Sequence, residues 1–240
     1  MCFNITFSQM KDYIESRFGS SLEGIDVVQP IYHSSGFRLP DHLCILDSEP
    51  NRVQYVKWGL VPHWVKDEEH AGKIRFQTLN ARSETVFQKP SFREPIKRTR
   101  CMVLVDGFFE FREFNGKKYP YLIRLKSEKA FALAGIWDEW GGRRTFSIMT
   151  TEANPLMAEI HNTKKRMPVI LPRDVERDWI DPSADTDRLK ELMAPYDEKD
   201  MAAHTVSRKL GARGENTNVP GILDEVRYPE LEIMSLDSFL

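Results

Sequence analysis

A series of short β-prone runs separated by turn signals constrains the fold of this chain more than any other sequence feature. The hairpin signal Asn115-Gly116 lies between two aromatic-rich runs, and this pair tolerates the positive φ that a tight turn needs. Gly141-Gly142 predicts a second tight turn. Many short strands with few helices favour an antiparallel sheet or a partly closed barrel. The expected strands are residues 42–46, 52–58, 100–105, 119–125, 131–136 and 145–151.

Helical patterns are fewer and lie before and after these runs. Met10, Ile14 and Phe18 recur at intervals of four residues, which predicts a helix beginning near Ser8. No repeat and no linker rich in Pro, Gly or Ser divides the chain. We therefore expect a single α+β domain over residues 1–240, with an antiparallel, partly closed β-barrel-like core flanked by helices. Its core should cover about residues 2–180, and the segment from about Asp185 should pack on the same core. Further helices are expected at residues 155–160, 175–180 and 187–193.

The charge balance limits any nucleic-acid site to a local patch, because the formal net charge is -2. Two basic clusters are candidates, although a cluster of this kind is usually an ordinary solvated face. The clusters are Arg93, Lys97, Arg98 and Arg100, and then Lys164, Lys165 and Arg166.

Targeting and cross-linking signals are absent from the sequence. The N-terminus lacks the basic and long apolar regions of a signal peptide, and no apolar run is long enough to cross a bilayer. We therefore expect a cytoplasmic protein without a membrane partner. Cys2, Cys44 and Cys101 form no CxxC pair, which argues against a disulfide framework and against a structural zinc site.

Cys2 is the first candidate for chemistry, because Met before a small residue is normally removed in the cell. Cys2 would then carry a thiol and a free α-amine, with ordinary pKa values of about 8.5 and about 7.7–8.0. Both groups should have a usable nucleophilic fraction at neutral pH. The amine can condense with an aldehyde, and the thiol can then close a thiazolidine ring. The alternative is that Cys2 is a small buried residue in a first strand.

Two further motifs offer groups that suit nucleic acid. Trp58 and Trp64 flank a Gly- and Pro-containing loop, where exposed rings could stack on unpaired bases or buried rings could fill the core. Asn80 offers a donor and an acceptor together, and Arg82 offers a planar fork suited to phosphate. The same stretch is also compatible with a helix-capping turn and a surface arginine.

Glu110 and His161 are the candidates for proton transfer. Glu110 lies among Phe108, Phe109 and Phe111, and apolar surroundings would raise its pKa, although strand alternation could equally point it to solvent. His161 follows an expected short helix and precedes Lys164, Lys165 and Arg166. A lone histidine is usually structural, but one beside three cations could transfer protons near a phosphate.

The order of these motifs along the chain resembles that of the SRAP family, the SOS response-associated peptidases or abasic site processing proteins. The similarity covers Cys2 to about Ile180, with a weaker trace through His204 and residues 216–220. The matching motifs are Met-Cys at the start, WGLVPHW, NARSET, RCMVLVDGFFEF and IHNTKKRMPVIL.

The resemblance implies a sensor of abasic sites in single-stranded DNA, acting in the DNA damage (SOS) response. Cys2 would crosslink covalently to the ring-opened sugar, Asn80 and Glu110 would orient the sugar and the amine, and His161 would transfer protons. No metal and no cofactor are expected, and the protein should act as a monomer. The expected DNA contacts are Arg82, Trp58, Trp64, Thr150, Thr151 and Arg166.

Two departures from the family pattern affect the expected DNA contacts. The usual Cys-Gly-Arg opening is Cys2-Phe3-Asn4, and a proline-rich stretch after the first helix is replaced by residues 32–36. The competing hypothesis is a peptidase or amidohydrolase, possibly autoproteolytic, in which Cys2 is an N-terminal nucleophile and its own α-amine is the base. A third is a noncatalytic nucleic-acid-binding module.

Overall fold

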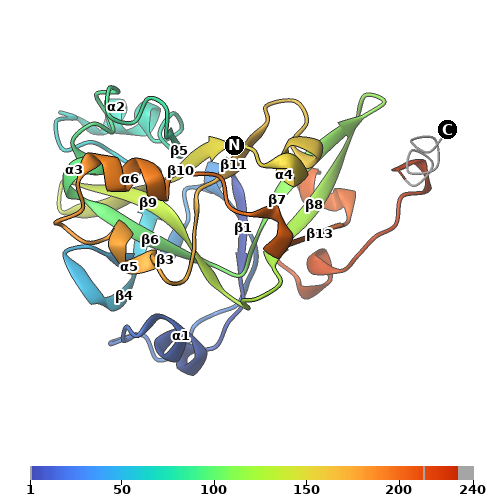
Figure 1. Cartoon of the computed structure of the whole chain (residues 1–240), viewed down its shortest axis with the longest axis horizontal. Coiled ribbons are helices and arrows are strands. Elements are labelled where there is room, and N and C mark those ends of the chain that lie inside the picture. The colour runs from blue at the N-terminus through green and yellow to red at the C-terminus, as the bar shows by residue number, and fades with distance from the viewer. Residues whose placement is uncertain (1, 213, 232–240) are drawn as a thin grey trace.

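Five strands close into a ring in the computed structural model, which describes residues 2–212 and 214–231 (Figure 1). Each neighbouring pair around the ring is antiparallel except one, because β10 meets β4 in parallel, with Thr145 opposite Lys57 and Phe146 opposite Trp58. The mixed α+β class and the largely antiparallel, partly closed core expected from the sequence are confirmed. The ring strands are β3 (Asp41–Leu46), β4 (Glu49–Trp58), β6 (Arg100–Val105), β9 (Phe131–Trp140) and β10 (Arg143–Glu152).

Short strands extend this sheet beyond the ring. β5 (Asn80–Arg82) runs parallel to β10, and β11 (Arg166–Pro168) runs antiparallel to it. β12 (Ile170–Leu171) pairs with β9. β10 is therefore the strand to which two separate segments of the candidate site, β5 and β11, attach.

A second sheet has the order β13-β8-β7-β1-β2. The β7–β8 hairpin turns at Asn115 and Gly116, whose φ values are 48° and 71°, as the sequence predicts. The first strand, β1, lies between β2 and β7, with Asn4 opposite both Ser35 and Phe109. Its strands are β1 (Asn4–Phe7), β2 (Ile31–Ser35), β7 (Gly107–Phe114), β8 (Lys117–Leu125) and β13 (Met201–Thr205).

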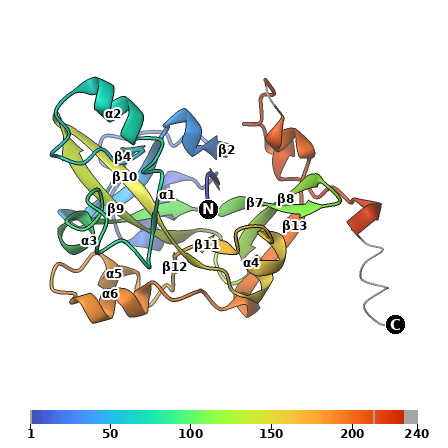
Figure 2. The same cartoon turned by 90° about the horizontal axis from the view of Figure 1, so that it is seen from above.

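Helices lie mainly around the ring (Figures 1 and 2). In both views α2, α3, α5 and α6 lie on the ring side, while β7, β8 and β13 lie on the other side. The first helix buries Ile14 and Phe18, but Met10 precedes it and is 79% exposed. No helix within the described residues is long and apolar enough to cross a membrane. The helices are α1 (Lys11–Phe18), α2 (Glu68–Ile74), α3 (Pro95–Arg98), α4 (Pro155–Ile160), α5 (Glu176–Trp179) and α6 (Thr186–Leu192), with short 3-10 turns η1 (Gly36–Arg38), η2 (Glu198–Asp200), η3 (Arg208–Gly211) and η4 (Pro220–Leu223).

Arg100 is fully buried and does not belong to a basic surface patch, so that expectation is wrong for this residue. Its guanidinium donates to the carbonyl oxygens of Trp179 and Asp181, each at 2.6 Å. It also donates to the carbonyls of Ile96 and Lys97. Arg100 therefore joins β6 to α3 and to the end of α5.

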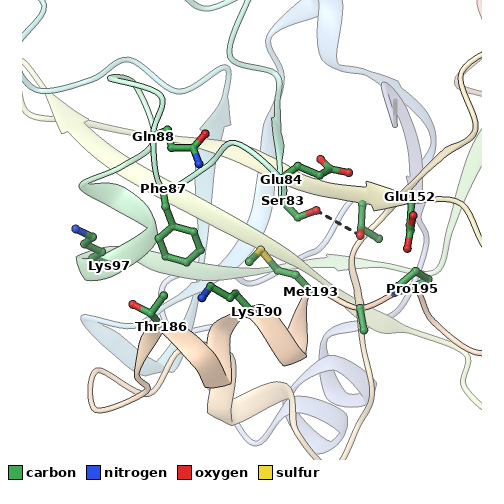
Figure 3. Close-up of a pocket in the computed structure, with 12 residues that line it drawn as sticks. Ser83, Glu84, Phe87, Gln88, Lys97, Glu152, Thr186, Lys190, Met193 and Pro195 are labelled. Atoms are coloured by element: carbon green, nitrogen blue, oxygen red, sulfur yellow. Dashed lines mark hydrogen bonds between the residues drawn. The ribbon is translucent and has the colours of Figure 1, made fainter.

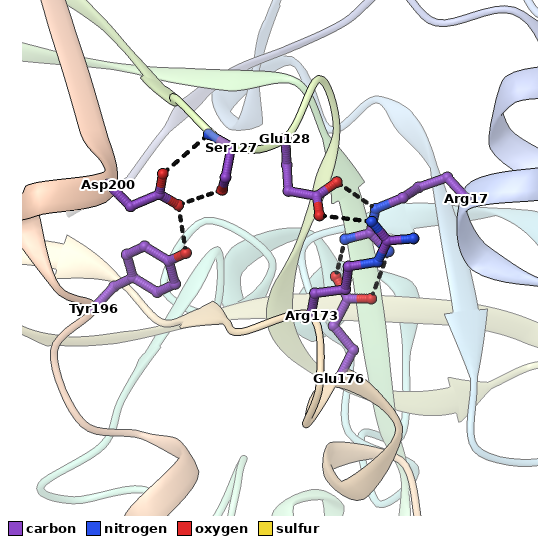
Figure 4. A network of polar contacts seen from close by, with 7 residues as sticks. All are labelled: Arg17, Ser127, Glu128, Arg173, Glu176, Tyr196 and Asp200. Atoms are coloured by element: carbon purple, nitrogen blue, oxygen red, sulfur yellow. Dashed lines mark hydrogen bonds and ion pairs between the residues drawn. The ribbon is translucent and has the colours of Figure 1, made fainter.

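A second buried arginine, Arg17 of α1, is held by carboxylates (Figure 4). Arg17 donates to both carboxylate oxygens of Glu176 at 2.9 Å and, through Nε, to Glu128 at 2.9 Å. Burial acts to lower the pKa of Arg17, but the paired carboxylates of Glu176 and Glu128 raise it above its ordinary value. Glu128 also accepts from Arg173 at 3.0 Å. We call Arg17, Glu128, Arg173 and Glu176 the Arg17 network.

Candidate functional site

Cys2 lies next to Glu110 because β1 pairs with β7. The register places Asn4 opposite Phe109, so the residues before Asn4 run alongside Glu110. The Cys2 side chain is fully buried in an apolar cluster that includes Phe108 and Ile160. Burial raises the pKa of the Cys2 thiol far above its ordinary value, and the charge of Glu110 adds to the effect. The thiol is therefore neutral at pH 7, contrary to the expected thiolate fraction, and needs a base to accept its proton.

Glu110 points into the protein, which decides between the two orientations that strand alternation allowed. It is 4% exposed, and burial raises its pKa to about 7. Its Oε2 atom lies 3.7 Å from Nδ1 of His161. At neutral pH the carboxyl group can thus either accept or donate a proton.

His161 reaches Glu110 from the C-terminal end of α4, which packs on β7. Pro155 begins this helix, and the side chain of Asn154 caps it by accepting from the backbone N–H of Met157 at 2.8 Å. The Nδ1–H of His161 donates to the Arg166 carbonyl at 2.9 Å, so the ring lone pair is on Nε2. Burial lowers the pKa of His161 to about 4, which keeps the imidazole neutral at pH 7.

Asn80 and Arg82 lie on β5, opposite Ile148 and Thr150 of β10. Asn80 is buried, yet neither its Oδ1 nor its Nδ2 has a hydrogen-bond partner within the described residues. Leaving such groups unpaired costs about 1–3 kcal/mol, so the amide is suited to a ligand. Arg82 is exposed, and both side chains line a pocket of about 340 Å³ together with Lys89 and Phe92.

Arg166, Thr150 and Thr151 lie in the interior, although the sequence suggested that they contact DNA. Arg166 donates to the Thr150 carbonyl at 2.8 Å and pairs with Glu84. Thr151 accepts from the Ser83 hydroxyl at 3.3 Å. In this arrangement the three residues connect β10 and β11 to the segment after β5, and only Thr151 among them also lines the hollow described below.

The two tryptophans of the WGLVPHW motif have different environments. Trp58 is fully buried, its Nε1–H donates to the Leu79 carbonyl at 2.8 Å, and its ring stacks on Phe146. It cannot stack on a base in this arrangement. Trp64 is 42% exposed and lies beside His70, so it keeps a ring face for a ligand.

A hollow of about 840 Å³ lies between the segment after β5 and α6 (Figure 3). Ser83, Glu84 and Phe87 line one side, and Lys190 and Met193 line the other. Cys2, Glu110 and His161 are not part of its lining, so the proton-transfer groups are not in this hollow. Across the described part of the chain, no three His, Cys, Asp or Glu side chains gather as metal ligands would.

A contact between the two segments that depart from the family pattern was not foreseen from the sequence. His33 Nε2 lies 3.0 Å from Asn4 Oδ1, and the ring of Phe3 lies 4.7 Å from that of Phe37. Each segment was noticed separately, but only the pairing of β1 with β2 brings them together.

The fold, with its five-stranded ring and second sheet, is that of the SRAP class of proteins. The chain belongs to this family: the sequence profile of SRAP, SOS response associated peptidase, matches residues 1–213.

Relatives and solved structures agree with this membership. The abasic site processing protein YoqW of Bacillus subtilis is 38% identical over 230 residues, covering 90% of this chain and 97% of YoqW. The abasic site processing protein HMCES of Gallus gallus is 33% identical over 189 residues, covering 67% of this chain and 54% of HMCES. A crystal structure of a Bacteroides thetaiotaomicron protein matches with a TM-score of 0.88 and 37% identity, covering 94% of this chain and all (100%) of that one.

Proposed function

We propose that this protein processes abasic sites in single-stranded DNA by forming a covalent thiazolidine crosslink through Cys2, after Met1 is removed. The observation that carries the proposal is the position of Cys2 beside Glu110, which in turn lies 3.7 Å from His161. The similarity to proteins named abasic site processing proteins supports the choice of substrate. The family description supports a place in the SOS response to DNA damage.

The chemistry begins at the α-amine of Cys2. The amine attacks the aldehyde carbon of the ring-opened sugar, and loss of one water gives an imine. The Cys2 sulfur then adds to the imine carbon, a C–S bond forms, and the thiol proton ends on the ring nitrogen. A carboxyl group with a pKa of about 7 is suited to carry that proton from sulfur to nitrogen.

His161 and Asn80 supply the remaining steps. Opening of the closed sugar and departure of water both need proton delivery to oxygen, and the neutral imidazole of His161 can exchange protons through Nε2. The unpaired amide of Asn80 can bind the sugar hydroxyls or an adjacent phosphate oxygen. Arg82, with Lys89 in the same pocket, provides positive charge for a phosphate.

A denaturing gel tests the proposal directly. Protein with Met1 removed, verified by mass, is mixed with single-stranded DNA that carries one abasic site. We expect a slow band that survives denaturant, and we expect no such band when an N-terminal extension turns the Cys2 amine into an amide. Cys2→Ser should lose the stable band while keeping an imine that borohydride can trap.

Cys44→Ala is the matched control, because it removes a buried thiol from β3 and should crosslink normally. A full yield of stable crosslink from Cys2→Ser would rule out the thiazolidine. Absence of a band from the processed wild-type protein, together with cleavage of a peptide, would favour the N-terminal-nucleophile peptidase instead.

A further inference from the structure

The segment around Thr217 contacts β2 through both side chains and backbone. Asn218 Oδ1 accepts from the backbone N–H of Tyr32 at 2.8 Å and of His33 at 3.3 Å. The Thr217 hydroxyl, which is buried, lies 2.6 Å from Nδ1 of His33. Residues near the end of the described chain therefore hold the strand that pairs with β1.

His33 links the segment around Thr217 to β1. Its Nε2 lies 3.0 Å from the side-chain oxygen of Asn4, so Nε2–H donates to Asn4 while Nδ1 accepts from Thr217. Burial, together with the charge of Arg38, lowers the pKa of His33 to about 4, so the ring is neutral at pH 7 and its two hydrogen bonds set the tautomer. Both ring nitrogens of His33 are thus hydrogen-bonded, Nδ1 to Thr217 and Nε2 to Asn4 of β1.

The contact reaches the backbone immediately after the nucleophile. The carbonyl of Asn4 lies 3.9 Å from the Cys2 sulfur, and the Phe3 carbonyl accepts from the backbone N–H of Gly36 at 2.8 Å. The His33 ring also packs perpendicular to the ring of Phe109, the residue before Glu110, with ring centroids 5.6 Å apart. His33 therefore contacts the strand of the nucleophile and the strand of the base.

We propose that Thr217, acting through His33 and Asn4, positions Cys2 for ring closure onto the imine. The order of contacts is Thr217 Oγ1, His33 Nδ1, His33 Nε2, Asn4 Oδ1 and then the backbone that carries Cys2. Thr217, His33 and Asn4 are positioning residues, and none of them transfers a proton in the reaction. The inference rests on the proposed function for its rate readout, and thiol accessibility provides a second readout that does not.

Thr217→Val tests the inference, because it removes the hydroxyl and keeps the shape of the side chain. Its matched control is Thr205→Val, which removes a hydroxyl that donates to the Val226 carbonyl at 2.6 Å and ties the same C-terminal region to β13 without touching His33. We expect Thr217→Val to slow single-turnover crosslinking to abasic single-stranded DNA about tenfold, as expected for misplaced reacting groups. Binding to DNA with an unreactive tetrahydrofuran abasic analogue should be unchanged. Thr217→Ser should restore the rate, and Thr205→Val should crosslink at the wild-type rate.

Alkylation of Cys2 by iodoacetamide, followed by peptide mass spectrometry, gives the second readout. Thr217→Val should increase Cys2 alkylation relative to Thr205→Val, with Cys44 and Cys101 as buried internal references. A wild-type rate for Thr217→Val, or equal slowing by both variants, would overturn the inference and leave the proposed function intact. If the wild-type protein forms no crosslink, the proposed function fails. The alkylation comparison then decides the inference: a selective increase supports it, and equal alkylation of the two variants overturns it.

Discussion

The Arg17 network and the Cys2 site both bury ionisable side chains, but the groups next to their carboxylates differ. In the Arg17 network each carboxylate of Glu128 and Glu176 lies within 3.0 Å of an arginine nitrogen. In the Cys2 site the carboxylate of Glu110 lies 3.7 Å from a neutral imidazole and close to a neutral thiol. The first arrangement pairs each carboxylate with arginine, although burial still raises the pKa of Glu176. In the second arrangement the charge of Glu110 changes near pH 7.

The difference shows how the pKa of a buried group depends on the neighbours of that group. Burial moves the pKa of Glu110 up to about 7 and that of His161 down to about 4, which makes both groups able to exchange protons near neutral pH. The same burial around Arg17 is opposed by its carboxylate partners, which raise its pKa further. Pairing with arginine thus favours stability in the Arg17 network, and the shifted pKa values of Glu110 and His161 favour chemistry in the Cys2 site.

The largest effect is expected from Arg17→Met, which keeps an apolar stem and removes the charge. Glu176 and Glu128 would be left without their main partner, and breaking a buried pair in this way costs about 3–5 kcal/mol. Urea unfolding should show a lower midpoint with an unchanged slope. Arg188→Met, which breaks a more exposed pair with Asp178, should cost only about 0–1 kcal/mol. Equal losses from the two variants would contradict the proposed role of the Arg17 network.

Glu110→Gln should raise the free energy of unfolding at alkaline pH, whereas substitutions that break the Arg17 network should lower it. The folded-state pKa of Glu110, about 7, lies above its ordinary value, so the fold favours the protonated carboxyl group. That contribution is fully present below the ordinary pKa and is lost as pH rises through about 7. Glutamine does not ionise, so we expect the free energy of unfolding to rise by up to about 3 kcal/mol at pH 8 and by less toward pH 5.

Urea unfolding at several pH values measures this gain. Glu176→Gln is the control, since it removes a counter-charge of Arg17 and should destabilise at pH 8. A lower stability of Glu110→Gln at pH 8 would mean that Glu110 is compensated in the same way as the carboxylates of the Arg17 network.

The proposed proton-transfer roles of Glu110 and His161 predict the next effect, which is on the rate of crosslinking. His161→Ala and Glu110→Gln should each slow single-turnover crosslinking at least about tenfold, within the range for positioned acid and base groups. Binding to abasic DNA should change little, because neither group is assigned to phosphate. The rate of the wild-type protein should rise with pH through about 7 as Glu110 ionises, and Glu110→Gln should lose that component. His204→Ala, at a histidine bonded to the Leu223 carbonyl, is the control. Parental rates in both variants would show that Cys2 works unaided.

The smallest effect is expected at Arg82, an exposed residue that belongs to neither the Arg17 network nor the Cys2 site. Arg82→Ala should weaken DNA binding and reduce the salt dependence by about one phosphate contact. Arg173→Ala, at the exposed edge of the Arg17 network, should leave the salt slope unchanged. Titration of single-stranded DNA at several salt concentrations distinguishes them, and an unchanged slope for Arg82→Ala would remove this residue from the interface.

Local patterns predicted the elements whose own residues determine them. The strand at residues 100–105 and the helix at residues 155–160 were predicted with the observed bounds, and both glycine-containing turns have the expected positive φ. The strands β2, β5 and β13 were not predicted, because short strands are defined by the partners to which they bond. The helix α2 was also missed, since only Ala71 and Ile74 face the interior and leave a weak apolar stripe.

The sequence singled out the residue types of the candidate site but not the orientation of their side chains. The apolar neighbours of Glu110 indicated a raised pKa, and the basic turn after His161 singled out that histidine. The sequence could not show that Trp58 and Arg166 turn inward, because a ring or a guanidinium suits a core contact and a DNA contact equally well. The sequence also could not show that burial raises the pKa of Cys2 far above its ordinary value.

The pairing of β1 with β7 has a consequence during synthesis. Asn4 bonds to a strand that contains Phe109, and a ribosome adding about 5–20 residues per second needs on the order of ten seconds to pass from one to the other. β7 cannot cover the start of the chain during that interval. Under the proposed function, removal of Met1 from the nascent chain would therefore precede the pairing of β1 with β7. Glu110 and then His161 would join Cys2 only afterwards.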